Sequence, residues 1–161
     1  MNPERYPRRI LLCVAGLSPQ IVTETLYALT RAGEPRFVPT EIHLLTTAKG
    51  AEWARLTLLS DEPGWFHRLR QDYGLPDIRF TLDNIHILRD ADGRPLDDIR
   101  KLTDNEAIAD VITNKVRELT ADSDSAVHAS IAGGRKTMGF YLGYALSLFG
   151  RPQDRLSHVL V

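Results

Sequence analysis

The sequence lacks the features that mark secreted, membrane-bound or metal-binding proteins. Its single cysteine, Cys13, lies in an apolar run, so no disulfide framework can form. The first nine residues are polar and proline-rich, and the apolar run after them is too short for a signal peptide or a membrane span. The five histidines show no metal-ligand spacing. We therefore expect a cytoplasmic protein with no membrane contact and no metal.

An excess of one charge is also missing. The 161 residues carry a formal net charge of -1, which excludes a general positive field for the direct binding of long nucleic acid. Any site for an anion therefore has to be local. Repeats, low-complexity tracts and Pro/Ser-rich linkers are absent too, so we expect a single domain over residues 1–161.

Apolar runs of strand length alternate with segments of helical periodicity. We expect strands over residues 8–15, 41–46, 84–88, 126–131 and 156–161. We expect helices over residues 19–33, 48–59, 65–73, 104–119 and 137–149. This alternation predicts an α/β fold with a mainly parallel sheet of five or six strands and helices on both faces.

Hydroxyl side chains stand where four of these helices are expected to begin. A hydroxyl at this position accepts a hydrogen bond from a backbone N–H of the first helical turn. We predict this role for Ser18, Thr47, Thr137 and Thr103, the last in a capping box with Glu106.

Two loops that follow strands have unusual compositions. One spans residues 15–20 after the first strand, and the other spans residues 130–137 after the fourth. Ligands of parallel sheets bind outside the carboxyl ends of the strands. If the first and fourth strands are neighbours, both loops face one crevice.

The second of these loops has the chemistry of a phosphate site. Gly133 and Gly134 let backbone N–H groups approach an anion and permit positive φ, and the helix that follows adds unpaired N–H donors. Arg135 can bind two phosphate oxygens at once, Lys136 adds a point charge, and Thr137 adds a hydroxyl. A tight turn with two solvated cations is the plainer alternative. Cations at a helix N-terminus oppose its dipole, however, so this pair has no good role in stability.

The common nucleotide motifs do not fit the sequence. A Walker A loop needs glycine directly before Lys-Thr, where this chain has Arg135. A dinucleotide fingerprint needs a Gly-x-Gly-x-x-Gly pattern after the first strand, and none is present. Ordinary nucleoside triphosphates and NAD are therefore disfavoured as ligands.

Several other residues have two open interpretations. Tyr141 and Tyr144, one helical turn apart, either pack against the sheet, which we favour, or stack on a base. Residues 97–100 form either a lid that carries Arg100 to a ligand or a solvated loop. His128 is expected to be a hydrogen-bonding core residue rather than a ligand-binding one.

Three segments together resemble one family. Residues 16–26 resemble the first motif of CARF domains (CRISPR-associated Rossmann fold), and residues 98–100 with 104–105 resemble their middle loop. Residues 130–138, Ser-Ile-Ala-Gly-Gly-Arg-Lys-Thr-Met, are similar to their second and most specific motif. The resemblance covers nearly the whole chain and implies a Rossmann-like fold.

The resemblance also implies a function. CARF domains are sensors of type III CRISPR antiviral signalling, which bind cyclic tetra- or hexa-adenylate at the twofold axis of a homodimer and regulate a fused effector. No other cofactor is implied. We thus expect this chain, which stops on an apolar strand, to be the N-terminal part of a longer effector protein. The expected ligand-binding residues are Gly16, Leu17, Ser18, Gln20, Arg100, Asn105, Ser130, Ala132, Gly133, Gly134, Arg135, Lys136 and Thr137.

Three alternatives to a pure sensor stay open. Some CARF domains cleave the ring without metal, by attack of a ribose 2′-OH on the adjacent phosphodiester; here Ser18 would position the hydroxyl and Lys136 would stabilise the transition state. The second alternative is that the chain is the ligand-binding domain of a transcription regulator. A nucleotide-dependent enzyme with an unfamiliar phosphate loop is the third alternative.

Overall fold

The described residues form one sheet of five parallel strands. The structure, a computed structural model, describes residues 2–32, 36–97 and 102–158. The strand order is β3-β2-β1-β4-β5, which makes β1 and β4 neighbours, as the crevice hypothesis required. The strands are β1 (Arg8–Ala15), β2 (Glu41–Thr46), β3 (Ile85–Ile87), β4 (Ser125–Ser130) and β5 (Arg155–Ser157). The predicted α/β, Rossmann-like fold is confirmed.

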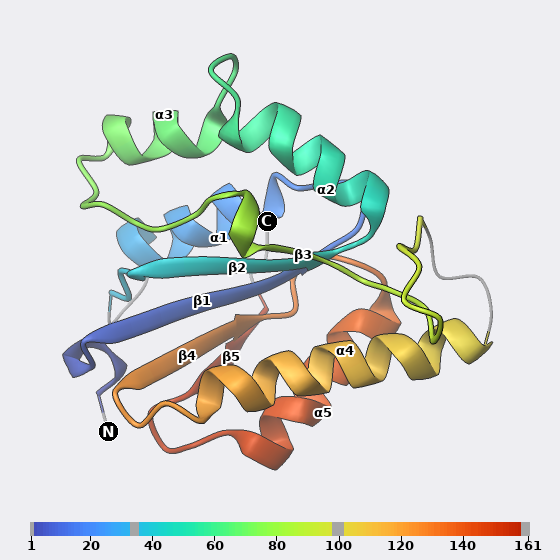
Figure 1. Cartoon of the computed structure of the whole chain (residues 1–161). Helices are drawn as coiled ribbons and strands as arrows, with labels where there is room; N and C mark the ends of the chain where they lie inside the picture. Colours follow the sequence, from blue (N-terminus) through green and yellow to red (C-terminus); the bar gives the residue numbers. More distant parts are fainter. Residues whose placement is uncertain (1, 33–35, 98–101, 159–161) are drawn as a thin grey trace.

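Helices cover both faces of the sheet (Figure 1). One layer holds three helices, of which the first two continue into π-helical turns: α1 (Ile21–Tyr27) with η2 (Ala28–Ala32), α2 (Ala48–Ala54) with η3 (Arg55–Leu59), and α3 (Trp65–Asp72). The other layer holds α4 (Leu102–Thr120) and α5 (Lys136–Phe149). Two short 3-10 turns, η1 (Pro3–Arg5) and η4 (Leu82–Asn84), complete the described elements.

The central strand β1 is apolar along its length because both of its faces are buried. Successive side chains of a strand point to opposite faces. Ile10, Leu12 and Val14 join the core under α4 and α5, whereas the alternate residues Leu11, Cys13 and Ala15 join the core under α1, α2 and α3. Burial in this apolar layer raises the pKa of the Cys13 thiol to about 12, so the thiol stays protonated.

One of the four predicted helix caps is confirmed. The Thr47 hydroxyl accepts a hydrogen bond of 3.2 Å from the backbone N–H of Gly50 at the start of α2. The other three predictions are wrong. The N-caps of α1 and α5 are Gln20 and Arg135, neither with a side-chain cap, and α4 begins at Leu102, one residue before Thr103. Ser18 and Thr137 thus each stand two residues away from the N-cap position.

The expected strand and helix boundaries differ slightly from those observed. β3 is shorter than predicted, and β5 ends at Ser157, so His158 is not part of a strand. The predicted end of the first helix at Gly33, and the last three residues of the predicted fifth strand, lie outside the described residues.

Candidate functional site

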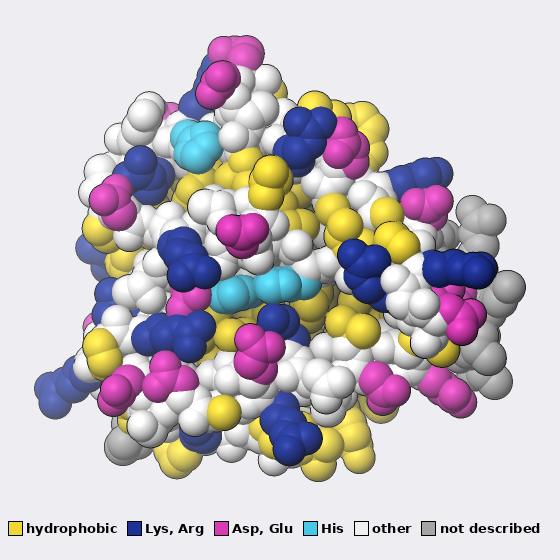
Figure 2. All heavy atoms as spheres, in the orientation of Figure 1, with side chains coloured by type: hydrophobic (Ala, Val, Ile, Leu, Met, Phe, Trp, Pro, Cys, Tyr) yellow, Lys and Arg dark blue, Asp and Glu magenta, His cyan; other side chains and the backbone are white. Residues whose placement is uncertain are grey.

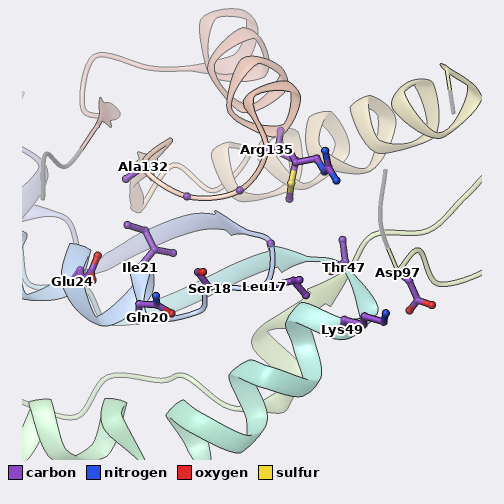
Figure 3. A pocket seen from close by; sticks show the side chains of 14 residues that line it. Leu17, Ser18, Gln20, Ile21, Glu24, Thr47, Lys49, Asp97, Ala132 and Arg135 are labelled. Atoms are coloured by element: carbon purple, nitrogen blue, oxygen red, sulfur yellow. The ribbon is translucent and has the colours of Figure 1, made fainter. Parts of the chain in front are cut away.

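A groove of about 680 Å³ lies at the carboxyl edge of the sheet. The parallel register aligns the ends of the three central strands, with Ala15 of β1 beside Thr46 of β2 and Cys13 beside Ser130 of β4. The loops that follow β1, β2 and β4 therefore meet there (Figure 3). The groove is lined by Gly16, Leu17, Ser18, Gln20, Ile21, Glu24, Thr47, Lys49, Asp97, Ala132, Gly133, Gly134, Arg135 and Met138.

The loop after β1 is held against the start of α2. The Thr46 hydroxyl donates a hydrogen bond of 3.3 Å to the carbonyl oxygen of Gly16. A Cβ atom at Gly50 would lie 2.0 Å from that hydroxyl and 2.4 Å from the same carbonyl oxygen. Such close approach leaves no room for a side chain, so glycine at this position allows the two loops to form one continuous wall.

The loop after β4 also depends on its glycines. A Cβ atom at Gly133 would lie 2.6 Å from the carbonyl oxygen of Val14 and 2.8 Å from Cγ2 of Ile21. Gly134 has φ of +77°, a left-handed conformation that side chains disfavour. The sequence-based expectation of a positive φ in this turn is therefore confirmed at Gly134.

Positive charge reaches the groove from two elements. Arg135 lines it at the N-terminus of α5, where the helix carries no side-chain cap and its dipole favours an anion. Lys49 lines it from the first turn of α2. Figure 3 shows both side chains at the same end of the groove, with Glu24 at the other end. Phosphate oxygens are thus favoured near Arg135 and Lys49.

The structure brings most of the predicted ligand-binding residues to this groove. Gly16, Leu17, Ser18, Gln20, Ala132, Gly133, Gly134 and Arg135 line it. Lys136 instead lines a second hollow of about 620 Å³, which shares residues 132–135 with the groove and continues along Phe140 and Tyr144 of α5.

The remaining predicted residues line neither of these two hollows or lie outside the described residues. Ser130 is buried at the end of β4, where its hydroxyl accepts a hydrogen bond of 3.4 Å from the backbone N–H of Ala132. Thr137 is exposed on α5. Asn105 is partly buried on α4, and its Oδ1 atom has no hydrogen-bond partner within the described part of the chain. Arg100 lies outside the described residues.

The two tyrosines of α5 have different environments. Tyr141 packs against the core, as we favoured from the sequence. Tyr144 is 56% exposed and lines the second hollow, so the packing interpretation is wrong for this residue.

Sequence reasoning missed several groove residues, chiefly Thr47, Lys49 and Glu24. Thr47 and Lys49 follow β2, whose carboxyl end lies beside that of β1, so the same rule that singled out the other two loops applied to them. Glu24 lies one helical turn after Gln20 and shares its face of α1. These three residues carried no glycine or phosphate motif that would have marked them.

A cluster of histidines lies away from the groove, in a surface hollow over β2 and β3 (Figure 2). The rings of His43 and His86 are stacked, and Nδ1 of His43 lies within hydrogen-bond distance, 2.8 Å, of Nε2 of His86. His43 Nε2 lies 2.9 Å from a carboxylate oxygen of Glu41, which also pairs with Arg8. Burial lowers the pKa of both rings, that of His86 to about 4. Since these groups satisfy one another, the cluster is structural.

His128 is a hydrogen-bonding residue between strands, as expected. Its Nε2 atom lies 2.7 Å from the hydroxyl of Ser157 on β5. The described residues contain no group of three or more His, Cys, Asp or Glu side chains able to hold a metal ion. None of the helices in the described part of the chain is long and apolar enough to cross a membrane.

Comparison with known proteins identifies a family to which this chain is similar. The model of the family described as CRISPR-associated protein NE0113 matches residues 18–161. No curated protein sequence matches the chain. Among solved structures, Enterococcus italicus Csm6 bound to cyclic hexa-2'-fluoro-hexa-dAMP is similar, with a TM-score of 0.53 and 13% identity. The match covers 96% of this chain but only 34% of the Csm6 chain, and at this identity it concerns the fold alone. The chain belongs to the CRISPR-associated protein NE0113 family, and it is a CARF domain.

Proposed function

We propose that this domain is a sensor of type III CRISPR antiviral signalling that binds cyclic oligoadenylate in the groove. The observation that carries the proposal is the meeting, at one end of the groove, of the Gly133-Gly134 turn, the uncapped N-terminus of α5, Arg135 and Lys49. Backbone donors, a helix dipole and two cations together form an anion site. In this proposal the rest of the groove receives ribose and base.

The groove and the fold both support the proposed ligand class. A volume of about 680 Å³ at an open sheet edge exceeds what one phosphate needs, and the loops lack the motifs for ordinary nucleoside triphosphates or NAD. Csm6, which has a similar fold, was solved with a cyclic hexanucleotide analogue. These points support a cyclic oligoadenylate as the ligand, with either four or six nucleotides.

The proposal includes a homodimer. Phe140, Tyr144 and Leu148 form an apolar stripe along α5 and are 66%, 56% and 57% exposed. Residues four apart on a helix share one face, so the stripe is continuous. Leu156 of β5 lies beside it across the second hollow. Because a large exposed apolar patch indicates an interaction surface, we assign this stripe to a second copy of the chain.

A twofold dimer suits the proposed ligand. A ring with an even number of identical nucleotides has the same symmetry as an isologous dimer. The α5 stripe starts beside Arg135 and Lys136, so contact along this helix sets two copies of the phosphate loop close together. Regulation of a fused effector, or of a DNA-binding domain as the alternative, is then a consequence of ligand binding at the dimer.

The test is a calorimetric titration with cyclic tetra-adenylate and cyclic hexa-adenylate. We expect the unsubstituted protein to bind one ring per dimer. The Arg135→Ala/Lys136→Ala variant should lose binding, while its thermal unfolding stays unchanged because both side chains are exposed. Arg117→Ala, an exposed change in the last turn of α4, is the matched control and should bind normally. Unchanged affinity in the double variant would remove the groove assignment.

The same samples test ring cleavage. Ser18 lines the groove with an exposed side chain, where it could position a ribose 2′-OH. Lys136 lines the adjoining hollow, at the face we assign to the dimer. Incubation of each ring with the protein and EDTA, followed by chromatography, separates the two functions: linear products that disappear in Ser18→Ala indicate a ring nuclease, and intact ring with tight binding indicates a sensor.

A further inference from the structure

Two acidic side chains line the groove within the described residues. Asp97 lies beside Lys49 in Figure 3, whereas Glu24 stands away from the cations. Glu24 lies on α1, one turn after Gln20, and both side chains line the groove. Figure 3 places Glu24 at the end opposite Arg135 and Lys49. A carboxylate near a phosphate weakens its binding by charge repulsion, so this end of the groove suits a part of the ligand that carries hydrogen-bond donors.

No side chain or backbone group within the described part of the chain pairs with the Glu24 carboxylate. It makes no hydrogen bond and no ion pair with a described residue. One candidate cation, Arg68 of α3, lines an adjoining hollow with Gln20 and Glu24. Arg68 is already engaged, because it donates a hydrogen bond of 2.6 Å to Glu62 and stacks over the Trp65 ring.

A role in helix stability accounts for only part of this placement. An acidic side chain in the first turn of α1 interacts favourably with the helix dipole, by about 0.3–1 kcal/mol. Any exposed acid in that turn supplies this term. The dipole does not require a carboxylate on the face of α1 that lines the groove.

Adenine presents a pattern that complements Gln20 and Glu24. Its N6 amino group donates hydrogen bonds, and the adjacent ring nitrogens N1 and N7 accept them. A carboxylate accepts only, whereas an amide both donates and accepts. Glu24 can thus accept from N6 while Gln20 donates to the neighbouring ring nitrogen. A 6-oxo purine carries an acceptor oxygen in place of N6, which faces the carboxylate unfavourably.

We propose that Glu24, assisted by Gln20, is the residue pair that recognises adenine in the groove and rejects 6-oxo purines. This inference rests on the proposed function, since it concerns the base of the same ligand. It assigns the two ends of the groove different tasks, with phosphate at Arg135 and Lys49 and base at Glu24.

The experiment compares cyclic oligoadenylate with cyclic oligoinosinate of the same ring size, by calorimetric titration. We expect the unsubstituted protein to prefer the adenylate ring by about tenfold or more, as for one good base contact. In Glu24→Gln the amide can turn to donate to the 6-oxo group, so the preference should fall to about twofold or less. Gln20→Glu, which removes the donor, should weaken the adenylate ring by about tenfold.

Controls separate this role from a structural one. Glu118→Gln changes an exposed acid near the end of α4, just before β4 and so at the opposite edge of the sheet, and should leave the preference unchanged. Equal weakening of both rings in Glu24→Gln overturns the inference, as does an unsubstituted protein that binds both rings alike. Failure of the unsubstituted protein to bind either ring instead overturns the proposed function, and this inference with it.

Discussion

Replacing Gly133 with alanine should both destabilise the domain and weaken ligand binding in its groove. The added Cβ would lie 2.6 Å from the Val14 carbonyl oxygen and 2.8 Å from the Ile21 side chain. Neither neighbour moves easily, because Val14 is paired with Leu45 of β2 and Ile21 is buried. Reaching ordinary contact at 3.4 Å requires a shift of about 0.8 Å, the difference between 3.4 and 2.6. Overpacking of this kind costs about 1–3 kcal/mol of unfolding free energy.

The expected result is a Tm lowered by roughly 2–4 °C for each kcal/mol lost. Displacement of the loop also moves the backbone donors of the anion site, so ring affinity should fall by about tenfold or more. Thermal unfolding followed by circular dichroism measures the first effect, and calorimetric titration measures the second.

The matched control is Gly139→Ala in α5, the helix that follows this loop. There the added Cβ would lie 3.5 Å from Cβ of Ile131, which is ordinary contact. In a helix interior, alanine is also more favourable than glycine by about 1 kcal/mol. This variant should be as stable as the unsubstituted protein or more so. Equal stability of Gly133→Ala and Gly139→Ala would refute the claim that close packing of the turn on β1 and α1 shapes the groove.

Three further predictions follow from single contacts. Burial lowers the pKa of His128 from 6.5 to about 4, so the unfolded chain takes up a proton before the folded one does. Stability is therefore lost as pH falls from about 6.5 to 4, by up to about 3 kcal/mol. His128→Gln should flatten the dependence of Tm on pH over that range, and an unchanged slope would count against this role of His128. Lys49→Ala should weaken ring binding by about tenfold at low salt and less at high salt, whereas Lys115→Ala should not; equal effects would exclude Lys49 from the anion site. Phe140→Asp should give a monomer in sedimentation with unchanged Tm, and a persistent dimer would exclude the α5 stripe as its interface.

The fold was predictable from sequence where burial left a pattern. β1 shows an uninterrupted apolar run because helices cover both of its faces, and β2 was placed correctly at both ends. The helix caps were less predictable, since the Ser18 hydroxyl stands in a loop that lines the groove and Thr137 is exposed in the first turn of α5. Local sequence does not reveal whether such a hydroxyl turns toward its own helix, and the Thr47 hydroxyl does so whereas the others do not.

The groove was predictable only where its residues are contiguous. The turn from Gly133 to Arg135 carries its own chemical pattern, and it lines the groove as expected. Lys49 has no such pattern and reaches the groove only because β2 lies beside β1. His43 and His86 were likewise scattered in sequence and stack only because β2 and β3 are paired. Strand order, which the sequence leaves open, therefore decides both clusters.

Arg135 and Lys136 share the second hollow, and Arg135 also lines the groove, so in the proposed dimer ligand binding and assembly are linked. Arg135, the N-cap of α5, lines both the groove and the second hollow, whereas Lys136 lines only the second hollow, beside the apolar stripe of α5. In the proposed dimer the second hollow lies at the contact between copies. A ring that engages both cations then touches both surfaces, so it binds the dimer more tightly than the monomer. By linkage the ring must strengthen the dimer by the same factor, which is the coupling a sensor needs to report its ligand.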